Sequence, residues 1–332
     1  MLFYKNLEDI VFGRHEVVPD VDQLIIISGY VGPQMIKRLQ DLPFQSRVIY
    51  GMYGESGIGR PLHKALVNLE KSLPKTDIYY SKIPVHAKCY MWMHNHKIQH
   101  ALVGSANFSS NGLNNDYREV LAETTRDTFK PLLEYTASIM NEAILCTDNS
   151  VDLRGDSRKN KDCKNLVNND PDVCTMTLLN RNGDTSKGSG INWGFSEKGH
   201  NSPGVSYIPI RTSYIRMYPR IFKPKQTHAL SFTKGARPNR QNDAVELIWD
   251  DGTEMEGLLE GSQPVDGLQY PKNLSSSPDK KQIGLYLRRR LHLPPDAFVT
   301  KKHLEDYGRT TIDISRMGDG IYYLDFSVPK KP

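Results

Sequence analysis

The feature that most constrains this chain is a pair of short motifs, at residues 85–88 and 104–107. The first is Val-His-Ala-Lys, or H-x-K, and the second is Gly-Ser-Ala-Asn, or G-S-x-N. Residues i and i+2 of a β-strand point to the same face, so His86 and Lys88 are expected to project into one cleft. No other segment combines as many reactive or anion-binding side chains at such close spacing.

The residues around the motifs predict strands and a hairpin. The apolar segments 78–80, 89–93 and 100–103 have the composition of short strands. The polar segment 93–97 is predicted to be the hairpin turn between the last two strands. The second motif follows the third strand as a turn that can present backbone N–H groups, a hydroxyl and an amide.

These side chains suit one kind of chemistry. The imidazole of His86 can attack phosphorus, and the ammonium of Lys88 can neutralise phosphate charge without a metal. The hydroxyl of Ser105 and the amide of Asn107 can hydrogen-bond the non-bridging oxygens. A surface hairpin with an unrelated histidine and lysine is the alternative. The joining of both motifs on predicted strands argues against it.

The two motifs together resemble the HKD motif of the phospholipase D superfamily, which occurs once in this chain. A single copy is similar to the dimeric nucleases of that superfamily, in which two subunits build one active site. The resemblance implies His86 as nucleophile or acid, and Lys88, Ser105 and Asn107 as phosphate binders. Glu119 resembles the acidic residue that orients the histidine, and Asp116 is the rival candidate for that role.

One position departs from the superfamily motif. The aspartate of the motif would fall five residues past Lys88, where this chain has Met93. The departure argues against a standard phospholipase. It is similar to the restriction endonuclease branch of the NgoFVII and BfiI type, in which this aspartate is also not kept.

Residues 1–147 are predicted to form an α/β domain, because strands and helices alternate along them. With the resemblance, this domain is expected to be a phospholipase D-like α/β/α sandwich. The glycine cluster at 51–59 matches neither a P-loop nor a dinucleotide-binding loop and is predicted to be a flexible loop at the rim of the site. Further strands are expected at 23–28, 46–50 and 120–123, and helices from Pro33 and at 62–73 and 129–145.

The second half of the chain has a different pattern of polar and apolar residues. Residues 148–173 are polar and are predicted to be a linker. Residues 174–332 are predicted to be a mainly β domain. Strands are expected at 175–179, 207–210, 229–233, 244–249, 254–259, 311–314 and 321–326, and helices at 214–221, 281–291 and 300–307.

Three segments of this half resemble the B3-like DNA-binding domain of the same endonucleases, which implies a β-barrel. They are G-I-N-W-G at 190–194, W-D-D-G-T at 249–253 and L-R-R-R-L at 287–291. The resemblance implies two arms that reach the major groove, an open loop at 181–204 and a second open segment at 261–272.

Individual DNA contacts are expected within and beside these arms. Side chains whose donors and acceptors fit base edges are Asn192, Arg211, Gln263 and Asp266. Phosphate contacts are expected from Lys198, Arg237 and Lys272. Trp193 is expected either to anchor its loop or to touch DNA. For each of them the alternative is a solvated loop residue.

The charge distribution agrees with a nucleic-acid partner. Lys and Arg number 43 against 38 Asp and Glu, and residues 174–332 hold 23 of the basic and 17 of the acidic residues. A basic domain beside a near-neutral one favours a polyanionic ligand. A soluble basic surface without a ligand is the alternative.

Several other classes of protein are excluded or disfavoured. No apolar run is long enough to span a bilayer and no signal-peptide pattern is present, so a cytoplasmic protein is expected. The four cysteines form no C-x-x-C pair and are expected to be reduced thiols. His94, His96 and His100 match no zinc pattern, so no metal site is predicted.

The sequence therefore predicts a homodimeric, sequence-specific endonuclease for double-stranded DNA that forms a phosphohistidine and needs no cofactor of its own. Some NgoFVII-type enzymes work with a separate ATP-hydrolysing helicase subunit, so ATP and magnesium are expected only through such a helper. The alternatives are a DNA-recognition subunit that cuts only with that helper, a DNA-binding protein with a degenerate catalytic half, and a lipid-cleaving phospholipase.

Overall fold

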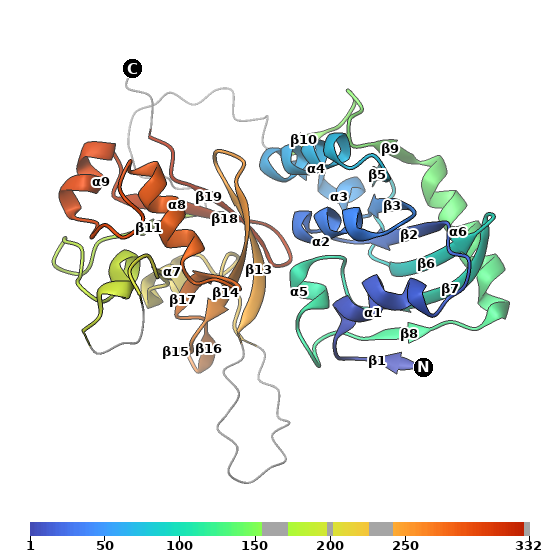
Figure 1. Cartoon of the computed structure of the whole chain (residues 1–332), viewed down its shortest axis with the longest axis horizontal. Coiled ribbons are helices and arrows are strands. Elements are labelled where there is room, and N and C mark those ends of the chain that lie inside the picture. Colours follow the sequence, from blue (N-terminus) through green and yellow to red (C-terminus); the bar gives the residue numbers. More distant parts are fainter. Residues whose placement is uncertain (155–171, 198–201, 226–241, 329–332) are drawn as a thin grey trace, which may run out of the picture. The chain divides into compact units, whose positions relative to one another are not determined.

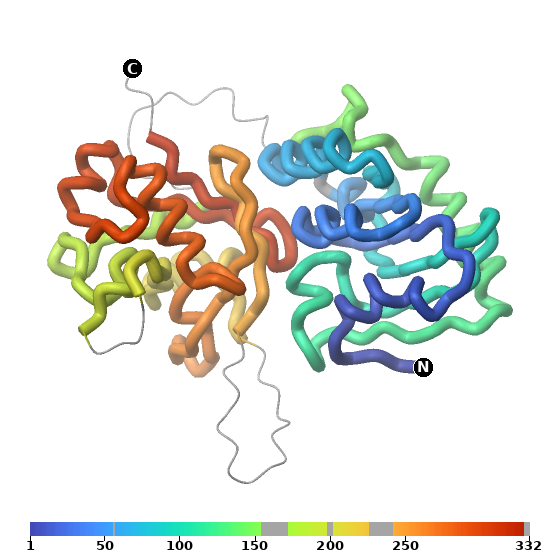
Figure 2. The backbone as a smooth tube through the Cα atoms, viewed as in Figure 1, coloured from blue at the N-terminus to red at the C-terminus, as the bar shows by residue number. Residues whose placement is uncertain are grey.

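The computed structural model describes residues 1–154, 172–197, 202–225 and 242–328. The chain divides into two compact units, Met1–Cys163 and Lys164–Pro332. Figure 2 traces the first unit from blue to green and the second from yellow-green to red. None of the helices in the described ranges has the length and apolar character that crossing a bilayer requires.

The first unit is built on a mixed sheet that, among residues 1–154, has the strand order β1-β8-β7-β6-β2-β3-β5-β9. Its strands are β1 (Leu2–Phe3), β2 (Gln23–Ser28), β3 (Gln45–Tyr50), β5 (Thr76–Ser81), β6 (Lys88–His94), β7 (Lys97–Gly104), β8 (Leu121–Glu123) and β9 (Ala143–Leu145). The α-helices are α1 (Leu7–Gly13), α2 (Pro33–Arg38), α3 (Tyr53–Ser56), α4 (Arg60–Ser72), α5 (Ser110–Leu113) and α6 (Phe129–Asn141). Short 3-10 turns lie at Arg14–Glu16, Leu39–Asp41 and Arg126–Thr128.

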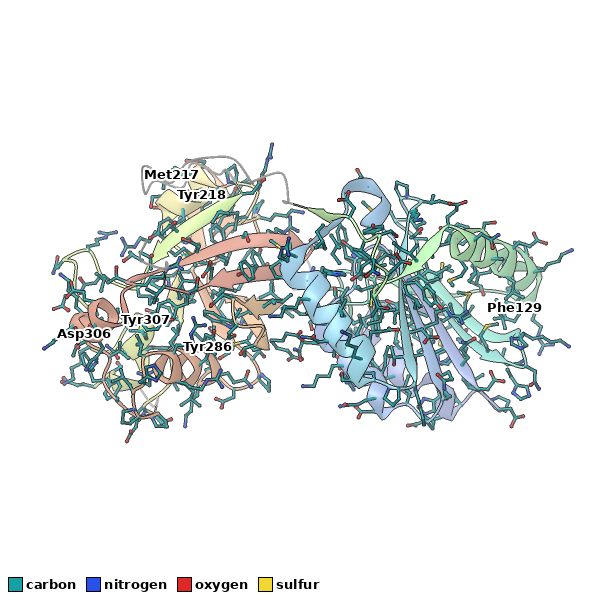
Figure 3. All side chains as sticks on the ribbon, turned by 90° about the horizontal axis from the view of Figure 1, so that it is seen from above. Phe129, Met217, Tyr218, Tyr286, Asp306 and Tyr307 are labelled. Carbon is teal, nitrogen blue, oxygen red and sulfur yellow. The ribbon has the colours of Figure 1, made fainter. Side chains whose placement is uncertain are left out.

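The central strand β2 is apolar on both faces because helices cover both sides of the sheet. Ile25 and Ile27 belong to a core cluster that includes Ile139 of α6. Leu24 and Ile26 alternate with them, so they point to the opposite face, and both are fully buried. Figure 3 shows α6 and α4 on opposite sides of the sheet. The predicted α/β/α sandwich is confirmed.

The directions of the strands bring several loops to one edge of this sheet. β2, β3 and β5 run parallel, whereas β6 is antiparallel to β2 and β7 is antiparallel to β6. The carboxyl ends of β2, β3, β5 and β7 therefore meet at the same edge as the amino end of β6. Both sequence motifs lie at this edge, one directly before and within β6 and the other at the end of β7.

Two predictions for the first unit are wrong in detail. The last helix ends at Asn141, and residues 143–145 form β9 at the edge of the sheet, antiparallel to β5. The glycine cluster is not an open loop throughout, because it contains α3 and the short strand β4 (Ile58–Gly59). β10 (Leu153–Arg154) pairs in parallel with β4, so the first unit continues into the segment predicted as linker.

The hairpin between β6 and β7 is tighter than predicted. Its turn is the pair Asn95 and His96, whose φ angles of 49° and 62° are both positive. Two positive φ angles in succession are the geometry of a two-residue type I′ turn. Met93 consequently belongs to β6 and is buried in the core.

The second unit contains a β-barrel-like sheet with the order β11-β18-β19-β13-β14-β17-β12 among its described residues. Its strands are β11 (Val173–Thr177), β12 (Ile208–Pro209), β13 (Asp243–Trp249), β14 (Glu254–Glu260), β17 (Asn273–Ser276), β18 (Thr311–Gly318) and β19 (Ile321–Asp325). The helices are α7 (Thr212–Met217), α8 (Gln282–Arg290) and α9 (Lys301–Tyr307), with a 3-10 segment at Gly190–Phe195. The predicted strand at 229–233 lies outside the described residues.

The predicted open segment at 261–272 is a two-stranded ribbon instead. β15 (Gln263–Val265) pairs antiparallel with β16 (Leu268–Tyr270). Asp266 and Gly267 form the turn with φ angles of 50° and 81°. Backbone pairing stiffens this arm, which Figure 1 shows at one end of the second unit.

Two of the three arginines in the L-R-R-R-L segment at the end of α8 have internal partners. Arg288 is fully buried and donates to the carbonyl oxygens of Ala297, Gly284 and Ile191. Arg290 makes two hydrogen bonds to Asp250, at 3.0 and 2.9 Å. It also contacts Tyr286 on α8 and Tyr307 on α9, which are labelled in Figure 3. Arg290 therefore fastens the hairpin of β13 and β14 to α8 and α9, whereas Arg288 joins α8 to the segments around Ile191 and Ala297.

Candidate active site

His86 and Lys88 lie together at the motif edge of the first sheet. Lys88 is the first residue of β6 and pairs with Ser28 at the end of β2. His86 is exposed, whereas Lys88 is only 4% exposed. The Lys88 ammonium lies 3.1 Å from Nδ1 and 3.2 Å from Nε2 of His86, and it donates to the His86 carbonyl at 2.6 Å. The two side chains therefore meet, as their spacing predicts.

Asn107 approaches the same place from the end of β7, and its amide has a fixed orientation. Its Oδ1 accepts the backbone N–H of Tyr30 at 3.1 Å and lies 3.5 Å from the hydroxyl of Ser28. The Ser28 hydroxyl also accepts the N–H of Phe108 at 2.9 Å. Because Oδ1 is engaged in this way, the side chain presents Nδ2 as a donor.

Gly29 is the residue that these three groups surround. A Cβ atom at this position would lie 3.2 Å from Cδ2 of His86, 3.3 Å from Nζ of Lys88 and 3.4 Å from Oδ1 of Asn107. The sequence reasoning missed Gly29. The available signal was a glycine placed directly after the most apolar strand of the domain.

Ser105 is exposed and connects the second motif to the next strand. Its Oγ accepts the N–H of Val120 at 3.1 Å, and its own N–H donates to the Val120 carbonyl at 3.0 Å. These two bonds fix the chain directly after Glu119. Burial raises the pKa of Tyr90 well above its ordinary value, with smaller contributions from Cys89 and then from the half-buried Glu119. The Tyr90 hydroxyl donates to Ala106 at 2.8 Å.

Asp116, the alternative to Glu119, has a hydrogen-bond partner in another part of the first unit. Asp116 is exposed and accepts the backbone N–H of Asn6 at 2.9 Å. Its carboxylate is therefore held against the N-terminal segment. Met93, at the position of the superfamily aspartate, is 2% exposed within the sheet, so this position lies in the core.

The three histidines of the β6–β7 hairpin have other roles. His100 accepts a hydrogen bond from Nε of Arg14 at 2.9 Å. Burial, followed by the positive charge of Arg14, lowers the pKa of His100 to about 4. Nδ1 of His94 lies 3.6 Å from Asp22. In the described ranges, no group of three His, Cys, Asp or Glu side chains is arranged to hold a metal ion.

Two of the predicted base contacts in the second unit serve the fold. Asn192 is 0% exposed, its Nδ2 donates to the Val299 carbonyl at 2.8 Å, and its Oδ1 accepts the Val299 N–H at 2.9 Å. The prediction that Asn192 reads a base is wrong, because both ends of its amide are used internally. Gln263 donates to the carbonyls of Ile210 and Pro271 at 2.7 and 2.9 Å, which anchors the ribbon.

The remaining DNA candidates differ in exposure. Asp266 is exposed at the tip of the ribbon and forms an ion pair with Arg216 at 3.1 Å, and Lys272 is exposed where the ribbon ends. Arg211 donates to the Leu179 carbonyl at 2.6 Å. Half-buried Trp193 packs edge-on against Tyr207, with ring centroids 5.2 Å apart. Lys198 and Arg237 lie outside the described residues.

Comparison with protein-family models gives two matches, one in each half of the chain. Residues 5–153 match the NgoFVII restriction endonuclease N-terminal PLD domain, and residues 166–318 match the NgoFVII C-terminal B3-like DNA-binding domain. Comparison with curated proteins gave no match.

Two solved structures are similar to part of the chain. NucT from Helicobacter pylori is 18% identical with a TM-score of 0.31, over 44% of this chain and 97% of that protein. The phospholipase D family member Nuc from Salmonella typhimurium is 14% identical with a TM-score of 0.32, over 42% of this chain and 89% of that protein.

The family assignment rests on the two domain models, which match in order and together take in most of the chain. The chain belongs to the NgoFVII family of restriction endonucleases and is a DNA endonuclease with a phospholipase D domain followed by a B3-like DNA-binding domain.

Proposed function

We propose that this chain cuts double-stranded DNA at a specific sequence, through a covalent phosphohistidine on His86, in an active site shared by two copies of the chain. The observation that carries the proposal is the meeting of His86, Lys88 and Asn107 around Gly29. A histidine, a cation and an asparagine amide that meet around one glycine suit a phosphate group.

The reaction has two steps that use two histidines. Neutral His86 of one copy attacks the scissile phosphorus, so that a P–N bond forms while the bond to the leaving DNA oxygen breaks. His86 of the second copy, in its protonated form, gives its proton to that oxygen. Water then attacks the phosphohistidine, the P–N bond breaks, and the second histidine, now neutral, accepts the proton from water. Histidine can fill both roles near neutral pH.

The other residues of the site stabilise the transferring phosphoryl group. The Lys88 ammonium and Nδ2 of Asn107 bind the non-bridging oxygens, which replaces the charge that a metal ion supplies in other nucleases. Ser105 adds a hydroxyl at the edge of the site. Glu119 orients the histidine. The single motif in the chain supports a second copy, since each copy supplies one histidine.

Recognition of the sequence belongs to the second unit. Asp266, at the exposed tip of the ribbon, accepts from an exocyclic base amine, while Lys272 contacts a phosphate. Trp193, Arg211 and Gln263 hold the arms in shape. Lys198 and Arg237 are proposed as further phosphate contacts on the basis of their sequence alone.

Plasmid cleavage by the purified chain tests the proposal. The reaction is run in EDTA, in magnesium, and in magnesium with ATP. Cutting at fixed positions in EDTA supports the metal-free mechanism. Cutting that depends on magnesium would overturn it. A protein that binds DNA but cuts in none of these conditions would be a recognition subunit awaiting an ATPase, or a degenerate binding protein.

Two histidine variants make the test specific. His86→Ala is expected to abolish cutting while DNA binding persists. His94→Ala is the matched control, because His94 ends the same strand β6 about 20 Å from Lys88. Acid-quenched protein with end-labelled DNA attached in wild type, but not in His86→Ala, would identify the covalent intermediate.

A further inference from the structure

We infer that Gly29, which lies outside both motifs, is a positioning residue of the nuclease site. The absence of a side chain there lets His86, Lys88 and Asn107 approach the end of β2 in the arrangement that binds the scissile phosphate. The inference rests on the proposed function and extends the site to a third segment of the chain, Ser28-Gly29-Tyr30.

The geometry at Gly29 is the first argument. A Cβ atom would lie between 3.2 and 3.4 Å from His86, Lys88 and Asn107. These three side chains come from two segments of the chain, yet all pack against Gly29. A phosphate oxygen must lie within about 3 Å of its hydrogen-bond donors. A methyl group on Gly29 would push at least one of the three side chains away from the position in which it meets the phosphate.

The backbone around Gly29 is held on both sides, so it cannot retreat from such a methyl group. The carbonyl of Ser28 accepts the N–H of Gly51 at 2.8 Å, and the carbonyl of Gly29 accepts the N–H of Met52 at 3.0 Å. The buried hydroxyl of Ser28 bonds the N–H of Phe108 and the carbonyl of Tyr30. The end of β2 is therefore fixed to the loops that follow β3 and β7.

The side chains of the site are confined as well. Tyr30 stands edge-on to the imidazole of His86, with ring centroids 6.4 Å apart and an interplanar angle of 84°. Its backbone N–H holds the amide of Asn107. A methyl group on Gly29 must therefore displace at least one of the three groups rather than slide between them.

Gly29 differs from the glycines that the fold itself requires. A Cβ atom on Gly51 would lie 2.1 Å from the Val85 carbonyl oxygen, and one on Gly104 would lie 2.0 Å from that of Val120. Those positions exclude alanine because backbone meets backbone. Gly29 meets only side chains, so Gly29→Ala is expected to fold and to fail in catalysis.

The test compares Gly29→Ala with Gly13→Ala in the full chain. Gly13 ends α1 and has open space around its Cβ position, which makes it the matched control. Gly29→Ala is expected to lower kcat by about 10-fold, because contacts of 3.2–3.4 Å are relieved by shifts of a few tenths of an ångström, less than the displacement of roughly 1 Å that costs about 100-fold. KM for DNA is expected to stay unchanged, because the second unit supplies DNA affinity. Gly13→Ala is expected to match wild type in both constants.

A destabilised variant is handled by measuring the rate at 10 °C per folded molecule, with the folded fraction taken from circular dichroism. A Gly29→Ala protein that keeps the wild-type kcat would overturn the inference. A loss of rate that is fully explained by the loss of folded protein would also overturn the inference, because Gly29 would then have a purely structural role.

Phosphate binding gives a readout that needs no turnover. Titration calorimetry measures the binding of inorganic phosphate by wild type and by Lys88→Ala. The difference between the two is the phosphate binding that depends on Lys88. This Lys88-dependent binding is expected to be lost in Gly29→Ala and kept in Gly13→Ala. If it is equal in wild type and Gly29→Ala, the inference fails. If wild type cuts no DNA but this difference is found, the proposed reaction fails and the assignment of Gly29 stands.

Discussion

The ammonium of Lys88 is almost equidistant from the two ring nitrogens of His86, at 3.1 and 3.2 Å, although the sheet leaves only 4% of Lys88 exposed. A cation held so close to the proposed nucleophile, in a place with little water, interacts strongly with any anion that binds there. The charge is therefore placed before the substrate arrives, which limits reorganisation during the reaction.

Replacing Lys88 by methionine keeps much of the length of the side chain and removes the charge. We expect kcat to fall by about 100- to 1,000-fold, in line with the loss of one electrostatic contact to the transition state. Rapid-quench cleavage at saturating enzyme measures this step. Lys64→Met, on the exposed face of α4, is the control and should cut normally. A Lys88→Met enzyme within a few-fold of wild type would contradict the assigned role.

Because the amide of Asn107 has a fixed orientation, the cleavage activities of two Asn107 variants are expected to follow an unusual order. Asn107→Asp has the same shape but replaces the Nδ2 donor by a carboxylate oxygen that repels phosphate. Asn107→Ala removes the donor and the acceptor of the Tyr30 N–H but adds no negative charge. Asp is therefore expected to be the more damaging substitution, whereas a role in packing alone predicts the reverse order. The kcat values of both variants, with melting temperatures as the control for folding, decide between these orders.

The stability of the first unit is expected to fall in acid through His100. Burial and Arg14 lower its folded pKa to about 4, whereas an unperturbed histidine titrates at 6.5. Between these values the unfolded chain binds the proton and the folded chain does not, so each step down in pH favours unfolding. The stabilisation present above pH 6.5 is thus lost progressively as the pH falls toward 4.

Urea unfolding of wild type and His100→Gln at several pH values measures this dependence. The variant should show a shallower loss of stability between pH 6.5 and 4. His94→Gln is the control on the same hairpin, since its side chain is 39% exposed against 15% for His100. Parallel pH curves for wild type and His100→Gln would exclude His100 as the source.

In the second unit, Asp250 joins the β13–β14 hairpin to α8 through two bonds to Arg290, and its Oδ1 also accepts the N–H of Phe326. Asp250→Ala is expected to cost about 1.5–3 kcal/mol of unfolding free energy, the range for hydrogen bonds to charged groups. Glu197→Gln breaks an exposed ion pair with Lys187 and should leave the stability nearly unchanged, because solvent screens such a pair. Chemical denaturation of both variants compares the two, and equal effects would contradict the structural role of Asp250.

The elements that could be predicted best are those whose burial is visible locally. β2 was predicted with its observed ends because a run of large apolar residues between polar ones can only be a covered strand. The end of α6 was missed because Ile144 and Leu145 continue the apolar pattern of the helix. Their conformation is decided by backbone pairing with β5, more than 60 residues earlier, which no local pattern records.

The same distinction holds for the candidate site. His86, Lys88 and Asn107 could be proposed because their types and spacing are informative on their own, and the structure brings them together. Gly29 could not be proposed in this way, because the role of a glycine depends on what surrounds it in space. The prediction for Asn192 failed because a polar residue between glycines indicates an exposed loop. Its hydrogen-bond partner Val299 lies 107 residues away, so the sequence around Asn192 does not reveal the contact.

The pairing of β10 with β4 determines where the two units can be separated. A protein truncated after residue 147 would lack the strand that lies beside Ile58 and the Asp152 N–H that donates to the Tyr53 hydroxyl at 2.7 Å. The loop that these contacts hold begins at Gly51, which is one hydrogen bond from the end of β2 and one from Val85, the residue before His86. Dividing the protein after Arg154 instead keeps the nuclease unit with its own last strand.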